Sequence, residues 1–135
     1  MLLHNFSDLL LAARAEPEPQ RLLLVFTARE LPHEAAPAHR ASFERGEGGA
    51  LVPVVCVDKA PEDIADFAAL RDEAAHTGKD WDILFVGALA GHAGKLPSDE
   101  RTDQALRGMV QQIRSGRISS YLTIDRDGEL VQLRA

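Results

Sequence analysis

Three short apolar runs in this sequence are each followed by residues that could bind a polar or anionic ligand. The runs are Leu22–Phe26, Val54–Val57 and Ile83–Leu89. The candidate ligand-binding residues that follow them are Arg29, Asp58, Lys59, His92 and Lys95. Parallel strands end side by side, at the edge of the sheet where open α/β proteins bind their ligands. We therefore expect these residues to converge on one site, whose cations and amides would suit a carboxylate or a phosphate.

The loop from Gly87 to Leu96 is rich in glycine and contains a Gly94-Lys95 pair, which suggests a phosphate-binding P-loop. The spacing does not fit, because Leu89 stands where the motif needs its first glycine, and Leu96 stands where it needs a serine or threonine. A looser role stays open, in which backbone amides near Gly91 and Gly94 hold a small anion together with Lys95. The alternative is an ordinary surface turn.

Cys56 is the single cysteine of the chain, so an internal disulfide is excluded. A nucleophilic role would need a nearby base such as His33, His39 or His92, and no sequence signature places one there. A cysteine between two valines is typical of a small buried hydrophobic residue. We predict that Cys56 is buried and unreactive, and we assign no catalytic residue.

Metal and cofactor sites are not expected. The spacing of His33, Glu34 and His39 matches neither HExxH nor a zinc ribbon. The Asp125–Gly128 segment resembles part of a calcium loop, but its alignment places Arg134 where the bidentate glutamate should be.

The composition is that of a soluble globular protein. The chain has 135 residues, of which 45% are hydrophobic and 27% charged, and this predicts one α/β domain over residues 1–135. Its formal net charge of −6 argues against nucleic acid as a partner. The first residues lack the pattern of a signal peptide, and no run approaches the roughly 20 apolar residues of a membrane span. We expect a cytoplasmic protein, without a membrane partner, that could form a homo-oligomer.

Helical patterns alternate with the apolar runs. Asn5 or Ser7 can cap a first helix that stops before Pro17, and Pro61 opens another. A shorter helix is predicted over Pro37–Arg45. The clearest pattern begins near Ser98 and is expected to bury Leu106, Met109, Val110 and Ile113.

This alternation predicts a three-layer α/β sandwich. Its mixed sheet should have three parallel strands and a C-terminal antiparallel hairpin around Asp125–Gly128, where Asp-Gly is a turn signal. The expected order of the first three strands is 2-1-3, because Pro53 cannot donate to a ladder and favours an edge.

Four segments carry a resemblance to a known family. They are Phe6–Leu10, Gln20–Phe26, Gly46–Ala50 and Cys56–Lys59. On these segments the chain resembles a family of small uncharacterised bacterial proteins, some of which carry the label "ribonucleotide reductase subunit alpha". The resemblance implies no catalytic residue.

Three functional hypotheses follow. The first is a non-catalytic binding or protein-interaction module, since no complete catalytic constellation is present. The second is an enzyme or sensor for a small anionic ligand, which would use the predicted site at the strand ends. The third, implied by the resemblance, is an accessory factor linked to ribonucleotide reductase.

Overall fold

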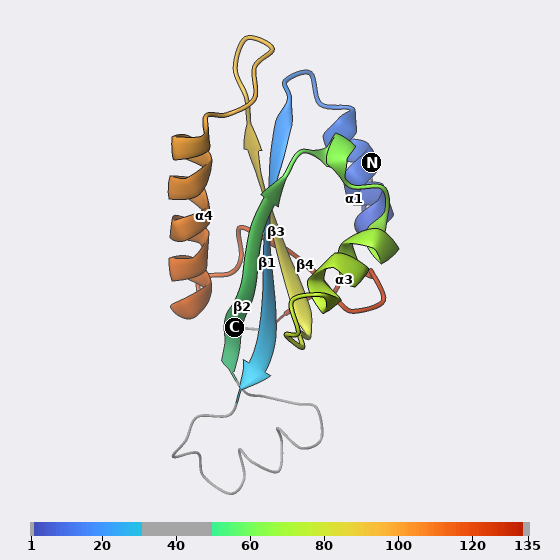
Figure 1. Ribbon diagram of the computed structural model, residues 1–135, viewed down its shortest axis with the longest axis vertical. Helices are drawn as coiled ribbons and strands as arrows, with labels where there is room; N and C mark the ends of the chain where they lie inside the picture. Colours follow the sequence, from blue (N-terminus) through green and yellow to red (C-terminus); the bar gives the residue numbers. More distant parts are fainter. Residues whose placement is uncertain (1, 31–49, 134–135) are drawn as a thin grey trace, which may run out of the picture.

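The structure is a computed structural model that describes residues 2–30 and 50–133. Its centre is a sheet of the strands β1 (Gln20–Glu30), β2 (Ala50–Lys59), β3 (Ile83–Ala90) and β4 (Leu122–Ile124) (Figure 1). The strand order is β2-β1-β3-β4, so the predicted 2-1-3 order of the first three strands is confirmed, with β2 at an edge. The helix predicted over Pro37–Arg45 lies outside the described residues, as do His33 and His39.

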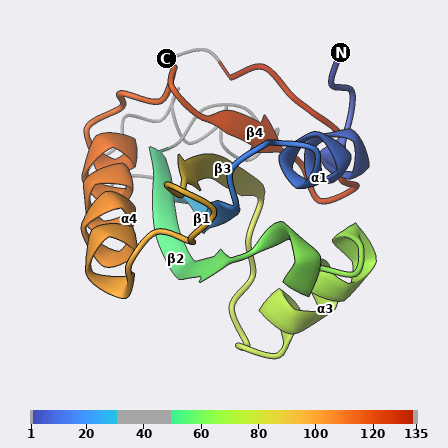
Figure 2. The ribbon, with the colours of Figure 1, turned by 90° about the horizontal axis from the view of Figure 1, so that it is seen from above.

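Helices lie on both faces of this sheet. They are α1 (Phe6–Arg14), the short 3-10 helix η1 (Pro61–Asp63), α3 (Phe67–Ala75) and α4 (Asp99–Arg114). Seen from above, α4 lies on one face, and α1 and α3 lie on the other (Figure 2). The side chains of Asn5 and Ser98 accept hydrogen bonds from the first turns of α1 and α4, which confirms both predicted helix starts. Pro61 opens only the 3-10 turn, and Asp66 caps α3 instead.

The prediction of three parallel strands is wrong. β1 is antiparallel to both β2 and β3, and β3 is antiparallel to β4. Glu30 pairs with Ala50, so the chain leaves β1 and returns beside it, instead of crossing to the other end of the sheet. The spacing between the two apolar runs is long enough for a crossover, but it also permits an antiparallel return.

The C-terminal turn is present where Asp125 and Gly128 predict it. The Asp125 side chain accepts hydrogen bonds from the backbone N–H groups of Asp127 at 2.9 Å and of Glu129 at 3.0 Å. Gly128 has a φ of +84°, which favours glycine. The returning chain then pairs with β4 through an isolated bridge between Ile124 and Leu130, so its described part forms no second strand.

Two apolar clusters hold the layers together. The larger one lies between the sheet and α1, η1 and α3, and it includes Phe6, Leu24, Phe26, Ile64 and Trp81. The smaller cluster lies under α4 and consists of Leu23, Val25, Phe85, Met109 and Ile113. Both faces of β1 are therefore covered, as its continuous apolar sequence predicts. Of the predicted α4 core residues, Met109 and Ile113 are buried, whereas Leu106 and Val110 are only partly so.

Gly108 offers a stabilising substitution within α4. It is exposed in the middle of the helix, and a β-carbon added there would meet no atom within 4 Å. Alanine loses less backbone entropy than glycine when a helix forms. We expect Gly108→Ala to raise the free energy of unfolding by about 0.5–1 kcal/mol, measured by chemical denaturation. A lower stability would show that this face of α4 is packed in solution.

Candidate functional site

The predicted ligand-binding residues do not converge on one site. Asp58 and Lys59 pair with Leu23 and Leu22 near the start of β1, whereas Arg29 pairs with Leu51 near the other end of the same ladder. Residues Gly91–Lys95 follow Ala90, which pairs with Gln20, so this loop lies at the Asp58 end. The convergence depended on parallel strands, and the antiparallel sheet separates Arg29 from the other candidates.

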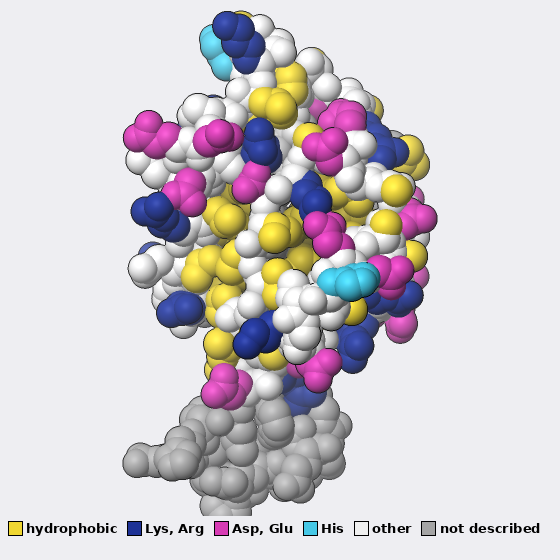
Figure 3. Space-filling view, viewed as in Figure 1, with side chains coloured by type: hydrophobic (Ala, Val, Ile, Leu, Met, Phe, Trp, Pro, Cys, Tyr) yellow, Lys and Arg dark blue, Asp and Glu magenta, His cyan; other side chains and the backbone are white. Residues whose placement is uncertain are grey.

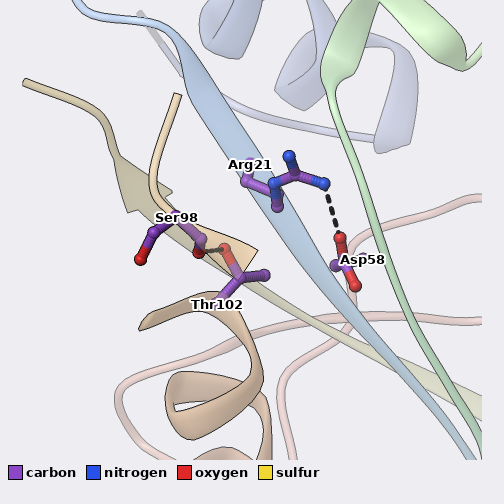
Figure 4. Close-up of polar contacts among 4 residues, drawn as sticks. All are labelled: Arg21, Asp58, Ser98 and Thr102. Carbon is purple, nitrogen blue, oxygen red and sulfur yellow. Dashed lines mark hydrogen bonds and ion pairs between the residues drawn. The ribbon is translucent and has the colours of Figure 1, made fainter. Parts of the chain in front are cut away.

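Asp58 and Lys59 are both engaged in ion pairs within the protein. A carboxylate oxygen of Asp58 accepts a hydrogen bond from Arg21 Nη1 at 2.7 Å (Figure 4). Lys59 Nζ lies 2.9 Å from a carboxylate oxygen of Glu73 in α3. The charges of Asp58 and Lys59, which the sequence suggested for binding a ligand, are therefore engaged by other residues of the protein.

The surroundings of Asp58 are acidic, which is unfavourable for an anion. A hollow of about 450 Å³ beside Asp58 is lined by the first turns of α4, with the residues Asp99, Glu100, Thr102 and Asp103. The Thr102 hydroxyl donates to the backbone carbonyl of Ser98 at 2.7 Å and so belongs to the helix start (Figure 4). No group of three or more histidine, cysteine or acidic side chains in the described part of the chain could hold a metal ion.

The loop from Gly91 to Lys95 is a tight turn whose amides already have acceptors. His92 and Lys95 exchange two backbone hydrogen bonds of 3.0 Å, and Ala93 and Gly94 between them have positive φ angles. The Gly91 N–H donates to the carbonyl of Pro19 at 2.8 Å. The Gly94 N–H donates to the carboxylate of Glu18 at 2.9 Å. The amides proposed for anion binding are therefore used by the protein itself, and the surface-turn alternative describes this loop better.

A larger hollow lies between the C-terminal end of α4 and β4. Its volume is about 840 Å³. The Tyr121 hydroxyl, whose pKa is raised by burial, donates to the side-chain oxygen of Gln112 in its lining. Arg117, Ser119 and Ser120 also line this hollow. Its described lining contains no histidine, cysteine or carboxylate, so it holds no base that could activate the two serines.

Cys56 is exposed, and the prediction that it is buried is wrong. Among the described residues, β2 has a neighbouring strand on one side only. A side chain on this edge strand therefore has cross-strand neighbours on that side alone, which leaves Cys56 at the surface. Partial burial raises the pKa of the Cys56 thiol, and the positive charge of Arg114 lowers it in part. The thiol is therefore accessible but mostly protonated at neutral pH.

We expect Cys56 to react with a thiol reagent in the native protein, without prior unfolding. Its rate at neutral pH should be below that of an unperturbed thiol, because the raised pKa reduces the thiolate fraction. The rate should rise with pH until the thiolate is fully formed. Arg114→Gln should lower the rate at a given pH, because a cation that favours the thiolate is lost. Labelling that requires denaturant would contradict the exposed position.

The edge strand β2 is the feature that the residue-by-residue search for chemistry missed. Seven consecutive apolar residues, Leu51–Val57, lie within it, and no residue of β2 is buried. Figure 3 shows hydrophobic side chains gathered as a strip over β2, between α4 and α3. Pro53 was the available signal, because it marks an edge strand.

Comparisons with protein-family models, with curated proteins and with solved structures find no match for this chain. The resemblance to the small bacterial family therefore stays a prediction. None of the helices described by the structure is long and apolar enough to cross a membrane.

Proposed function

We propose that this protein is an interaction module that binds other polypeptides by adding a strand at the edge of β2. The observation that supports it best is the long apolar edge strand, whose side chains are only partly buried. β2 is ten residues long, whereas proteins that avoid edge-to-edge association keep such strands short or charged. An extended peptide bound at this edge would gain main-chain hydrogen bonds and bury apolar side chains.

The devices that protect edges lie on both sides of a short central segment of β2. Its C-terminal end carries the charged residues Asp58 and Lys59. Pro53 removes a donor, and the register between β1 and β2 shifts at the same place, between the Phe26–Val55 and Thr27–Pro53 pairs. From Val55 to Val57 the strand carries neither a charge nor a proline, and it pairs with β1 without a register shift. This central segment is therefore the part of the edge best suited to pairing.

The local chemistry also favours binding over catalysis. Asp58 and Lys59 are held in ion pairs, and the described lining of the larger hollow contains no histidine, cysteine or carboxylate. Arg29, whose backbone N–H donates to Asp82 at 2.8 Å, lies at the far end of β1. The small-anion hypothesis thus loses the convergence on which it rested.

A peptide-display selection on the immobilised protein would test this function. We expect enriched peptides to alternate β-branched with polar residues, and to slow hydrogen exchange of the β2 amides. Cys56→Lys should weaken their binding at least tenfold, because a lysine in the middle of an edge strand opposes pairing. Leu11→Lys is the matched control, since Leu11 is 59% exposed on α1, away from this edge.

An equal effect of the two lysine substitutions would overturn the proposal. Exchange protection confined to another surface, such as the hollow beside Tyr121, would also overturn it.

A further inference from the structure

We infer that the partner of β2 is an extended segment that runs antiparallel to it, with basic side chains at its N-terminal end and acidic side chains at its C-terminal end. This inference rests on the proposed function and adds the chemistry of the partner. It follows from the charges of α4, from the position of α4 over the edge, and from strand direction.

The charges along α4 are unevenly distributed. Its first five residues, Asp99–Asp103, contain three acids and one arginine, whereas all charged residues from Gln104 to Arg117 are arginines. The acidic residues Asp99, Glu100 and Asp103 line the hollow beside Asp58, so they lie near the C-terminal end of β2. In Figure 3 the acidic side chains gather at the upper end of α4.

The basic part of α4 lies further along the same edge. Arg114 is close enough to Cys56 for its charge to act on that thiol. Figure 1 shows that α4 and β2 run in opposite directions, so the acidic start of α4 lies beside Asp58 and its arginine-rich end lies toward the start of β2.

Near Asp58 and Lys59 the ion pairs Arg21–Asp58 and Lys59–Glu73 balance their own charges, and Asp99 and Glu100 add an excess of negative charge there. A strand added at this edge would therefore meet net negative charge at one end and arginines toward the other. On the added strand, basic side chains would be favoured at the end beside the carboxylates, and acidic side chains at the end beside the arginines.

The position of α4 argues against a second copy of this chain as the occupant. α4 packs mainly along β2, the edge strand itself. Two β2 strands paired antiparallel would be related by a two-fold axis perpendicular to the sheet, which places both α4 helices on the same face. Paired strands lie about 4.8 Å apart, whereas packed helices need about 8–10 Å between their axes. A segment without an overlying helix avoids this collision.

The direction of the segment follows from the ladder geometry. Antiparallel pairs are slightly more stable than parallel pairs, and each described strand pair of this sheet is antiparallel. An antiparallel partner begins beside Lys59 and ends toward Ala50. Its N-terminal end therefore faces the acidic start of α4, and its C-terminal end faces Arg114.

Two synthetic peptides of identical composition would test this inference. Each has a centre of alternating valine and threonine. One carries lysines at its N-terminus and glutamates at its C-terminus, and the other has these charges exchanged. By fluorescence anisotropy at low salt, we expect the first to bind about tenfold more tightly, a ratio that a few exposed charge pairs can supply. The difference should shrink as salt is added.

A substitution tests the contribution of the charges to binding, and a modified peptide tests the contribution of the main-chain hydrogen bonds. Arg114→Glu should reduce the preference for the first peptide, while Arg101→Glu, at the acidic end of α4, should not. Each peptide has two alternate sets of amides, and only the set that faces β2 donates strand hydrogen bonds. N-methylation of that set should abolish binding of both peptides, whereas N-methylation of the other set should not.

The outcomes distinguish this inference from the proposed function. Equal affinities that N-methylation abolishes would overturn the charge order and leave strand addition standing. Binding that survives N-methylation of each of the two alternate sets in turn would overturn both. A protein that is dimeric by sedimentation and becomes monomeric with Cys56→Lys would show that a second copy occupies the edge, which would overturn the inferred partner.

Discussion

Phe26→Ala should lower the free energy of unfolding by about 3–5 kcal/mol. Phe26 is 1% exposed on the central strand β1, and its ring meets that of Trp81 edge-on, with 5.0 Å between the centroids. Truncation removes the apolar area that this ring buries and leaves a cavity, and it also removes an aromatic pair. Since domains are stable by only about 5–15 kcal/mol, this variant should unfold at a much lower denaturant concentration.

Leu11→Ala is the control for this measurement. Leu11 is 59% exposed on α1, so its truncation should change the free energy of unfolding by at most about 0.5 kcal/mol. A similar loss of unfolding free energy in Phe26→Ala and Leu11→Ala would show that the cluster around Phe26 and Trp81 is not the packed core of the protein.

Gly91→Ala should destabilise the protein by about 2–3 kcal/mol, on the scale of two backbone hydrogen bonds lost with their groups left unpaired. A β-carbon at Gly91 would lie 1.9 Å from the backbone carbonyl oxygen of Lys95. This contact involves backbone and cannot be relieved by a change of rotamer. The turn from His92 to Lys95 would therefore have to open, and its two hydrogen bonds would be lost.

Gly94→Ala separates the effect of contact from the effect of backbone conformation. Gly94 has a φ of +77°, but a β-carbon there meets no atom within 4 Å. The Gly94→Ala variant should therefore lose only the conformational penalty of about 1–2 kcal/mol in free energy of unfolding. Chemical denaturation of both variants checks the comparison, and a larger loss for Gly94→Ala would contradict the packing around Gly91.

The predictions about local structure and the prediction about the site had different outcomes. Capping residues and apolar spacing depend on the nearest neighbours in the chain, so the starts of α1 and α4 and the burial of Met109 and Ile113 could be predicted. The grouping of Arg29 with Lys95 depended on strand direction, which no short pattern specifies. That grouping was wrong because β1 is antiparallel to β3.

The sequence by itself determined the apolar strands, the capped helices, the turn at Asp125–Gly128 and, through Pro53, the edge position of β2. These features follow from backbone chemistry and from the period of apolar residues. Only the tertiary structure decided that β1 runs against both neighbours, that Asp58 pairs with Arg21, and that Cys56 is exposed. These outcomes arise from contacts between residues far apart in the chain, whose partners become defined only when the whole sheet is packed between its helices.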